Sequence, residues 1–370
     1  QGYAGLCVMS RSSDKIIKGD FAVEFSIKKG GAATSFACSL ENNSDTQNVI
    51  SAHPLVFMNN GNIRFCGKDV MGYDKNEWYD VRFEFSPKTS RAKLSLKKHS
   101  ENEWNIFAGF AFTSYWTGSE VNLSDGFNKI ELGYLGTDKE ASCVDNLRYY
   151  SASMGNINLI SDDFSVMPEI VSYYSATNPA KQWGADNISG KCDLDIKTVD
   201  GRQVLSIGAA ADTYYVTIGK LLSNLDLPDG ITCVIKFGIG MSDNAAAAGL
   251  VTNNGNTAML SLGSALSGSD GSWSGFENGK IYDFQFVYNS GISRVYLTAD
   301  NKVYAADTNA ALNRSFDFQF NIPAGGEVYL SSFEFDIVGE GCNAAKQYIK
   351  SGYETASLDD TIVFEYDQIL

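Results

Sequence analysis

The chain has 370 residues and carries 44 acidic against 29 basic side chains, a formal net charge of −15. This length is enough for two domains, and the 44% hydrophobic and 12% aromatic content is enough to build their cores, so wholesale disorder is excluded. The acidic balance argues against nucleic acid and against an anionic membrane surface as partners, and no run of about 18 apolar residues is present to insert into a bilayer.

The composition favours an all-β protein. Phe and Tyr, at 22 and 19 residues, prefer the half-buried surface of a pleated sheet, and the 35 glycines favour turns between strands. In chain order, alternating apolar and polar residues first predict strands at residues 5–9 and 21–27. A hairpin follows over residues 55–65, where Asn60-Gly61 predicts a two-residue type I′ turn.

The next alternating blocks occur twice in the chain. Residues 78–94, which begin WYDVRFEF, align without a gap with residues 281–297, which begin IYDFQFVY. Two further pairs of blocks keep the same order: residues 21–27 with residues 231–237, and residues 144–149 with residues 330–335. The sequence therefore predicts a tandem duplication of one β-domain.

This repeat divides the chain into two β-sandwich domains and a tail. The expected boundaries are residues 1–153, residues 158–340, and a C-terminal extension at residues 341–370 that ends in a strand. Residues 5–9 resemble the strand at residues 204–207, so the first domain lacks an opening segment that the second has.

Two interpretations of the unequal ends stay open. The chain, which starts at Gln1, is a processed form or a slice of a longer tandem array. Alternatively, the strand-like residues 361–366 fill the vacancy in the first domain, in the same or a neighbouring molecule, so that the chain self-associates through its C-terminal strand.

The seven cysteines are scattered and form no CxxC pair, which excludes a zinc ribbon or a dithiol redox site. Several lie in apolar strand patterns, so most are expected to be buried free thiols. Their positions are Cys7, Cys38, Cys66, Cys143, Cys192, Cys233 and Cys342.

One family resemblance is carried by short strand motifs. Residues 77–83 (EWYDVRF), followed by a hairpin and by residues 92–96 (AKLSL), resemble the central strands of concanavalin A-like jelly-roll domains, the laminin-G-like and lectin/glucanase group. Residues 143–150 (CVDNLRYY) resemble the last strand of such a domain, although the second half departs from the pattern, with Ile281 where the first has Trp78. The resemblance implies two tandem antiparallel β-sandwich (jelly-roll) domains.

Glucanases of this group use an E-x-D-x-x-E spacing on one strand, which places two acids on the same face. The nearest match here is Glu334, Asp336 and Glu340, with one residue too many before the last acid. Only two histidines occur in the chain. We therefore expect no catalytic residues and no enzyme activity.

Binding residues are suggested by two features. In the resembling domains a structural calcium often ties the first strand to the last. The candidate ligands for it here are Asp145, Asp162 and Asp163, and no other cofactor is expected.

Sugars stack on exposed aromatic rings that lie beside polar groups. The candidate rings are Trp104, Tyr115, Trp116 and Trp273. Trp78 and Trp183 are expected in the core instead.

The sequence thus predicts a non-catalytic, extracellular or cell-surface pair of modules from a larger, bacterial secreted or surface protein. Its expected partner is a glycan or another matrix ligand, in carbohydrate binding or adhesion. A structural or assembly module of a surface or filament protein, with no small ligand, is the alternative. A glycoside hydrolase or polysaccharide lyase-like enzyme is the third interpretation.

Overall fold

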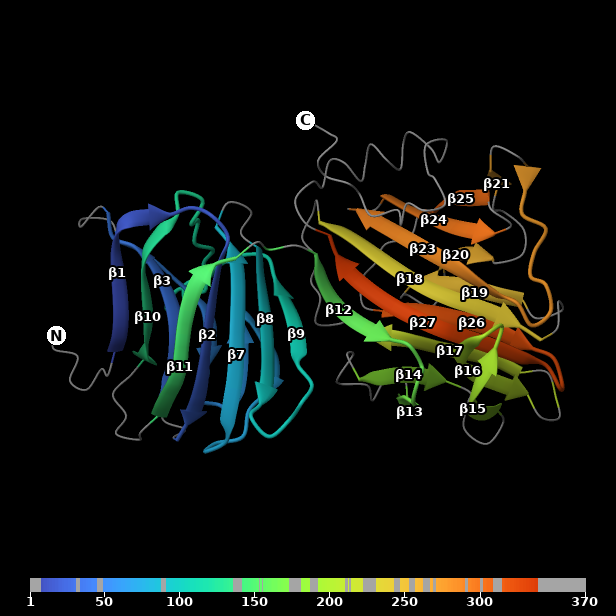
Figure 1. Ribbon diagram of the computed structural model, residues 1–370, viewed down its shortest axis with the longest axis horizontal. Coiled ribbons are helices and arrows are strands. Elements are labelled where there is room, and N and C mark those ends of the chain that lie inside the picture. The colour runs from blue at the N-terminus through green and yellow to red at the C-terminus, as the bar shows by residue number, and fades with distance from the viewer. Residues whose placement is uncertain are drawn as a thin grey trace. The chain divides into compact units, whose positions relative to one another are not determined.

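The computed structural model describes residues 8–30, 34–44, 49–87, 91–135, 142–152, 154, 156–172, 181–186, 192–209, 212, 214–221, 231–242, 247–252, 257–261, 267–268, 271–289, 292–299, 302–308 and 315–338. Within these residues the chain consists of strands and connections, with no helix, and the predicted all-β class is confirmed. The chain divides into two compact units at residues 157 and 158 (Figure 1). No helix long and apolar enough to cross a membrane occurs in the described part.

Two antiparallel sheets form the first unit. In pairing order, the six-stranded sheet contains β1 (Val8–Ile17), β10 (Phe127–Leu135), β3 (Ser35–Asn42), β4 (Ile50–Phe57), β5 (Asn62–Phe65) and β6 (Lys68–Gly72). The five-stranded sheet contains β11 (Ser142–Ser151), β2 (Phe21–Lys29), β7 (Trp78–Ser86), β8 (Arg91–Lys98) and β9 (Asn105–Gly109).

The core of the first unit lies between these sheets. The ring of Phe83 on β7 is 5.9 Å from that of Phe65 on β5, and the ring of Phe21 on β2 is 5.5 Å from that of Phe127 on β10. Side chains alternate along a strand, so each neighbour of a core residue on the same strand points to the other face of the sheet. Arg82, next to Phe83 on β7, therefore points away from the core. The five-stranded sheet therefore presents a polar outer face.

The predicted hairpin between β4 and β5 is present, but the predicted turn type is wrong. Gly61 has a φ of 90°, whereas Asn60 stays outside the positive-φ region that a type I′ turn requires of both residues. Gly61 donates its N–H to the Met58 carbonyl at 3.2 Å, and Met58 donates to the Asn62 carbonyl at 2.8 Å. The loop thus has three residues, and its last position adopts the left-handed conformation that glycine allows.

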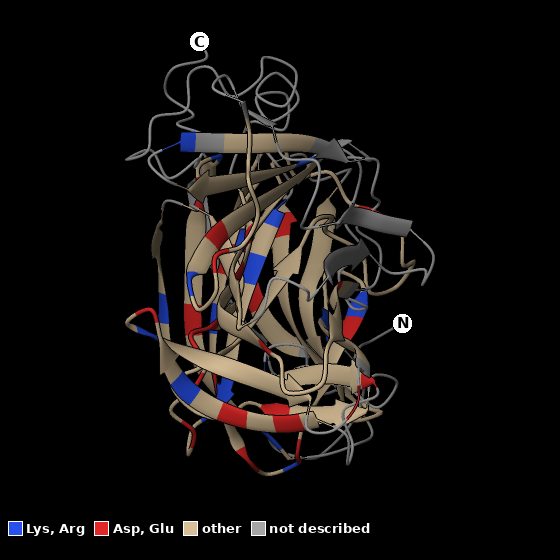
Figure 2. Cartoon of the chain, turned by 90° about the vertical axis from the view of Figure 1, so that its right-hand side faces the viewer, with Lys and Arg blue, Asp and Glu red and all other residues tan. Residues whose placement is uncertain are grey.

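The second unit also contains two sheets. The smaller contains β13 (Glu169–Ser172), β14 (Gln182–Asp186), β17 (Tyr214–Leu221), β26 (Ser315–Ile322), β19 (Ala247–Thr252) and β20 (Thr257–Ser261). The larger contains β15 (Cys192–Val199), β16 (Arg202–Ala209), β27 (Glu327–Ile337), β18 (Thr232–Met241), β23 (Ile281–Asn289), β24 (Ile292–Ala299), β25 (Lys302–Thr308), β21 (Ser267–Gly268) and β22 (Gly271–Ser272), with β12 (Ile157–Asp162) also paired to β27. Along β15 charged residues alternate with uncharged ones, a pattern that is also seen on strands in Figure 2.

Aromatic contacts join the two sheets of the second unit as well. The ring of Phe237 on β18 is 5.1 Å from that of Phe318 on β26. Trp183 on β14 is fully buried, as predicted, and its ring is 5.3 Å from that of Phe333 on β27. Trp78, in the first unit, is only half-buried.

The repeated sequence blocks occupy matching places in the two units. The order β11-β2-β7-β8-β9 in the first unit parallels β27-β18-β23-β24-β25 in the second. The predicted match of residues 5–9 to residues 204–207 is wrong for the part of it that the structure describes. Strand β1 pairs with β10 in the same way as β17 pairs with β26. Strand β1 therefore corresponds to β17 and not to β16, which contains residues 204–207.

One edge of the five-stranded sheet differs between the units. In the second unit β16 and β12 pair with β27, whereas no strand of the described residues pairs with the outer edge of β11. Residues 341–370, including the strand predicted at residues 361–366, lie outside the described part of the chain. Self-association through that segment therefore stays a prediction.

The described cysteines are free thiols, as expected for most of them. Cys38, Cys66 and Cys233 are buried, Cys192 is half-buried and Cys143 is exposed. Cys7 and Cys342 lie outside the described residues.

Candidate functional site

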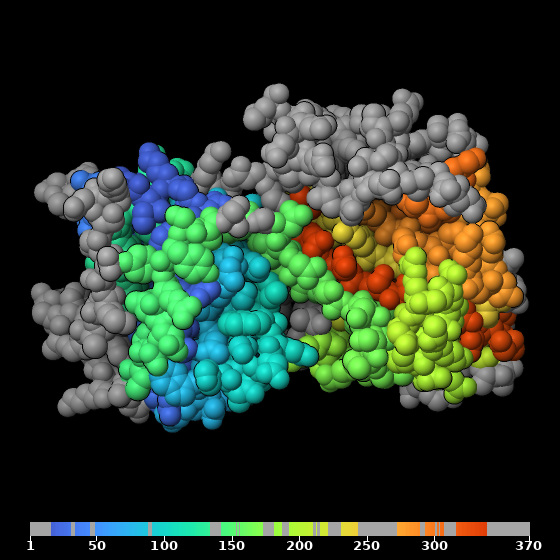
Figure 3. All heavy atoms as spheres, viewed as in Figure 1, coloured from blue at the N-terminus to red at the C-terminus, as the bar shows by residue number. Residues whose placement is uncertain are grey.

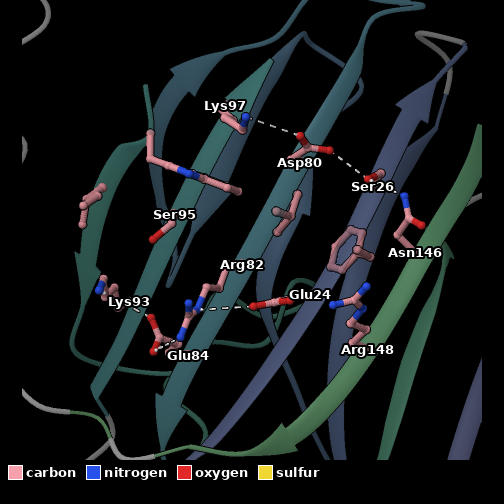
Figure 4. Close-up of a pocket in the computed structure, with 14 residues that line it drawn as sticks. Glu24, Ser26, Asp80, Arg82, Glu84, Lys93, Ser95, Lys97, Asn146 and Arg148 are labelled. Atoms are coloured by element: carbon pink, nitrogen blue, oxygen red, sulfur yellow. Dashed lines mark hydrogen bonds and ion pairs between the residues drawn. The ribbon is translucent and has the colours of Figure 1, made fainter. Parts of the chain in front are cut away.

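A pocket of about 470 Å³ lies on the outer face of the five-stranded sheet of the first unit (Figure 4). The strands that form this face, β11, β2, β7 and β8, are in view in the space-filling picture of the unit (Figure 3). The residues that line the pocket are Glu24, Phe25, Ser26, Asp80, Val81, Arg82, Glu84, Lys93, Ser95, Lys97, Trp104, Ile106, Asn146 and Arg148.

The register of the sheet arranges these polar side chains in rows across the strands. In one row, Ser26 on β2 lies opposite Asp80 on β7, and Asp80 lies opposite Lys97 on β8. Ser26 Oγ donates to Asp80 Oδ1 at 2.8 Å, and Lys97 Nζ is 3.8 Å from Asp80 Oδ2. His99 Nδ1 is 3.0 Å from Asp80 Oδ1.

These contacts set the charge of Asp80. Burial raises the pKa of its carboxyl, but the hydrogen bonds with His99 and Ser26 outweigh burial and hold that pKa below its usual value. Asp80 is therefore ionised at neutral pH and presents an acceptor to the pocket.

A second group joins two carboxylates through one guanidinium. Arg82 Nε is 3.5 Å from Glu24 Oε1, and Arg82 Nη2 donates to Glu84 Oε1 at 3.1 Å. Lys93 Nζ lies 3.5 Å from Glu84 Oε2, and Tyr150 donates its hydroxyl hydrogen to Glu24 Oε1 at 2.7 Å. Each carboxylate in this group is thus held by a cation.

The edge strand β11 adds Asn146 and Arg148 to the pocket. The register of β11 against β2 shifts between Asp145 and Arg148, and Asn146 there has a φ of 55°, a conformation that Asn tolerates better than most residues. Asn146 Nδ2 is 3.5 Å from Ser26 Oγ. Arg148 lies opposite Glu24 in the register and makes no ion pair within the described part of the chain.

Trp104, one of the residues predicted as sugar platforms, contributes an exposed aromatic ring to the pocket. It immediately precedes β9, and 42% of the residue is exposed. The ammonium of Lys97 lies 5.2 Å from the centre of its ring. Because so much of Trp104 faces solvent, its ring can make a further stacking contact with a ligand.

Tyr115 and Trp116 lie elsewhere in the first unit. Tyr115 packs against Ala37 and Val56, which lie opposite each other on β3 and β4 of the six-stranded sheet. Trp116 is 63% exposed and its ring is 5.1 Å from that of Tyr115. Trp116 is exposed and Tyr115 is partly buried, and neither residue lines the pocket.

Trp273 is a core residue and not a platform. It is 8% exposed, and its ring lies 4.9 Å from that of Phe276 and 5.3 Å from that of Tyr282. The expected exposure is wrong because these aromatic neighbours cover the indole.

The candidate calcium ligands are engaged by nearby hydrogen-bond donors. Asp145 Oδ1 accepts the N–H of Asn146 at 2.7 Å in the first unit. In the second unit, Asp162 Oδ2 accepts from Trp183 Nε1 at 2.7 Å, and Asp163 Oδ1 accepts the backbone N–H two residues on at 2.9 Å. Within the described residues no group of three or more His, Cys, Asp or Glu could hold a metal ion.

The acids of the incomplete catalytic motif lie on β27 of the second unit. Glu334 is 3.6 Å from Lys236 Nζ, and Asp336 accepts from Asn158 Nδ2 at 2.8 Å. Burial raises the pKa of Asp336. Glu340, the third acid of the motif, lies outside the described residues.

Most of the pocket was missed by the sequence analysis. Its charged residues are the polar positions of the segments predicted as strands, for example Asp80, Arg82 and Glu84 in WYDVRFEF. The alternation places all three on one face, and that was the available signal. The pattern does not contain the strand order, which brings residues of β11, β2 and β8 close to these three side chains.

Comparisons with known proteins give structural likenesses only. No family model matches the sequence, and no curated protein matches it. Among solved structures, peanut lectin is 10% identical with a TM-score of 0.31, over 50% of this chain and 97% of the lectin. A Lotus tetragonolobus seed lectin is 13% identical with a TM-score of 0.31, over 43% of this chain and 94% of that one. A carbohydrate esterase of the Shiga toxin-encoding bacteriophage phi24B is 10% identical with a TM-score of 0.31, over 50% of this chain and all of the esterase. These values are too low to transfer a ligand or an activity to this chain.

Proposed function

We propose that the first unit is a carbohydrate-binding module and that the pocket on its five-stranded sheet holds an oligosaccharide. The observation that carries this proposal is the combination of a 42% exposed indole, Trp104, with a groove of fixed hydrogen-bonding groups. A sugar ring presents an apolar C–H face that stacks on an aromatic ring, and hydroxyls that bond to carboxylates, amides and guanidinium groups.

The size of the pocket favours an oligosaccharide over a single sugar. The pocket residues come from all five strands, from β11 to β9. With strands spaced ~4.8 Å apart, the four intervals between these strands span about 19 Å. A ligand that contacts both Trp104 and Arg148 must therefore contain several sugar units.

The contacts of the carboxylates favour binding without hydrolysis. A glycosidase needs one carboxylic acid with a raised pKa to protonate the leaving oxygen. In the pocket Arg82 contacts both Glu24 and Glu84, and the pKa of Asp80 is lowered. These acids are suited to accept hydrogen bonds from sugar hydroxyls.

Glycan-array screening of the full chain, followed by isothermal titration calorimetry, tests this proposal. We expect binding at one site per chain and loss of most of the affinity in Trp104→Ala, because stacking on the indole is removed. Trp116→Ala is the matched control, since that residue is also an exposed Trp of the first unit but lies outside the pocket.

Two results would count against the proposal. If no glycan binds, the structural-module interpretation is favoured. If Trp116→Ala weakens binding and Trp104→Ala does not, the site lies on the six-stranded sheet. The extracellular or cell-surface setting stays a prediction and needs a separate localisation experiment.

A further inference from the structure

The charges that line the pocket do not balance. Its lining includes four cations, Arg82, Lys93, Lys97 and Arg148, against three carboxylates, Glu24, Asp80 and Glu84. The pocket therefore carries a formal charge of 4 − 3 = +1, on a chain whose net charge is −15. Such a local excess of positive charge attracts an anionic ligand to a surface that otherwise repels it.

The unbalanced cation is Arg148. Arg82 contacts two carboxylates, Lys93 contacts Glu84, and Lys97 contacts Asp80. Arg148 alone among the four makes no ion pair within the described residues, and its side chain is exposed at the rim formed by β11. In Figure 4 no dashed line leaves its guanidinium, although it lies beside Glu24.

The carboxylate nearest to Arg148 in the register is already engaged. Glu24 Oε1 accepts the hydrogen of the Tyr150 hydroxyl at 2.7 Å and is 3.5 Å from Arg82 Nε. These two partners hold Glu24 from both neighbouring strands, β11 and β7. The guanidinium of Arg148 is thus left with its donors available to a ligand.

We infer that the oligosaccharide is acidic and that a sugar carboxylate, of the hexuronate type, binds the guanidinium of Arg148. This inference rests on the proposed function. A guanidinium presents its donors as a planar fork that matches the two oxygens of a carboxylate. Because Trp104 and Arg148 lie at opposite edges of the same face of the sheet, the charged sugar and the stacked sugar are different units of one chain.

Calorimetry with three ligands of equal length tests the inference on the full protein. The probes are an oligogalacturonate, its fully methyl-esterified form, and a neutral galactose oligomer. The ester keeps the ring and the linkage, removes the charge and adds one methyl group to each carboxyl. We expect the acid form to bind about tenfold or more tightly than the ester, as a charge-assisted pair contributes, and its affinity to fall as salt is added.

Substitution of Arg148 locates the effect. Arg148→Gln is expected to reduce the affinity for the acid form to that for the ester and to leave the affinity for the ester unchanged. Lys18→Gln is the matched control, since it removes one positive charge from an exposed position of the same unit outside the pocket. Equal thermal unfolding of the two variants shows that the loss is not a loss of fold.

The outcomes separate the two proposals. If the ester and the acid bind equally and Arg148→Gln changes neither, the inference is wrong while carbohydrate binding stands. If neither they nor the neutral oligomer binds, and glycan arrays show no hit, both are wrong. A sulfated galactan oligomer forms a further arm, and tighter binding of that ligand than of the uronate would overturn the assignment of a carboxylate.

Discussion

Lys220 gives the second unit a stability that should rise with pH. The residue lies on β17, and its side chain is fully buried between the sheets. Its Nζ is 3.8 Å from Asp162 Oδ2 and 4.7 Å from the centre of the Trp183 ring, and it has no hydrogen-bond partner within the described residues. A charged amine in such a place has lost its water without full compensation.

The magnitude follows from proton linkage. Burial lowers the pKa of Lys220 from 10.5 to about 8, although the carboxylate of Asp162 acts in the opposite direction. Between these two values the unfolded chain holds the proton and the folded chain does not, so the free energy of unfolding rises with pH. At 1.36 kcal/mol per pH unit, the interval corresponds to about 3 kcal/mol.

Lys220→Met removes this dependence and shortens the unbranched side chain by only one heavy atom. We expect the wild-type second unit to gain up to about 3 kcal/mol from pH 8 to pH 10.5 relative to Lys220→Met. Lys236→Met is the control, since its amine is partly exposed in a surface ion pair with Glu334. Tyrosines that titrate in this range are present in all three proteins, and their contribution cancels in the difference.

Urea unfolding is carried out at several pH values and monitored by hydrogen-exchange mass spectrometry. Peptides from β17 and β26 report on the second unit alone. The reasoning is refuted if Lys220→Met and the wild type show the same pH dependence. It is also refuted if the stability of the wild type falls relative to the variant from pH 8 to pH 10.5, because that sign would mean that the folded state favours the charged amine.

Three further predictions concern the first unit. The pKa of Asp80 is lower in the folded chain than its ordinary value of 3.8, so its carboxylate stabilises the fold above about pH 3.8, and this stability disappears as the pH falls further. Asp80→Asn should therefore lose less stability on acidification than the wild type, as measured by thermal unfolding. Arg82→Met should destabilise the unit by about 2 kcal/mol in urea, because Glu84, only 7% exposed, loses a cation, and adding Glu84→Gln should recover part of that loss. Iodoacetamide should label the exposed Cys143 in the native protein and spare Cys38, whose pKa burial raises to about 12, as peptide mass spectrometry would show.

The strands were predictable because their signal is local. Alternation with a period of two marks β7 and β23, and the repeat of that pattern predicts matching places for the two strands in the two units. The position of β1 was not predictable, because residues 5–9 carry too short a pattern to distinguish a partner on β10 from one in the other sheet. The hairpin at Asn60-Gly61 shows the same limit, since a pair of turn residues predicts the turn but not the loop length.

The pocket depended on information that the sequence pattern lacks. Trp104, Trp116 and Trp273 are equally plausible platforms in a list of aromatic residues. Only the folded chain separates them: Trp104 lies beside Lys97, Trp116 lies beside Tyr115 outside the pocket, and Trp273 is buried.

The shared strand order of the two units does not extend to a shared binding face. At the positions aligned by the repeat, Arg82 of the first unit corresponds to Gln285 and Glu84 corresponds to Val287, which is fully buried. The aligned block at residues 330–335 places Glu334 where the first unit has Arg148.

The second unit therefore has no cation at the position where the proposed acidic ligand would bind the first unit. It also engages the acid that corresponds to Asp80, because Arg202 on β16 forms an ion pair with Asp283. The strand β16 pairs with β27, at the edge that corresponds to the outer edge of β11. In the second unit, the strand that extends the sheet beyond β27 thus supplies Arg202, which pairs with Asp283. In the described part of the first unit the corresponding edge is unpaired, and Arg148 faces solvent. This difference is the physical reason to expect one ligand per chain.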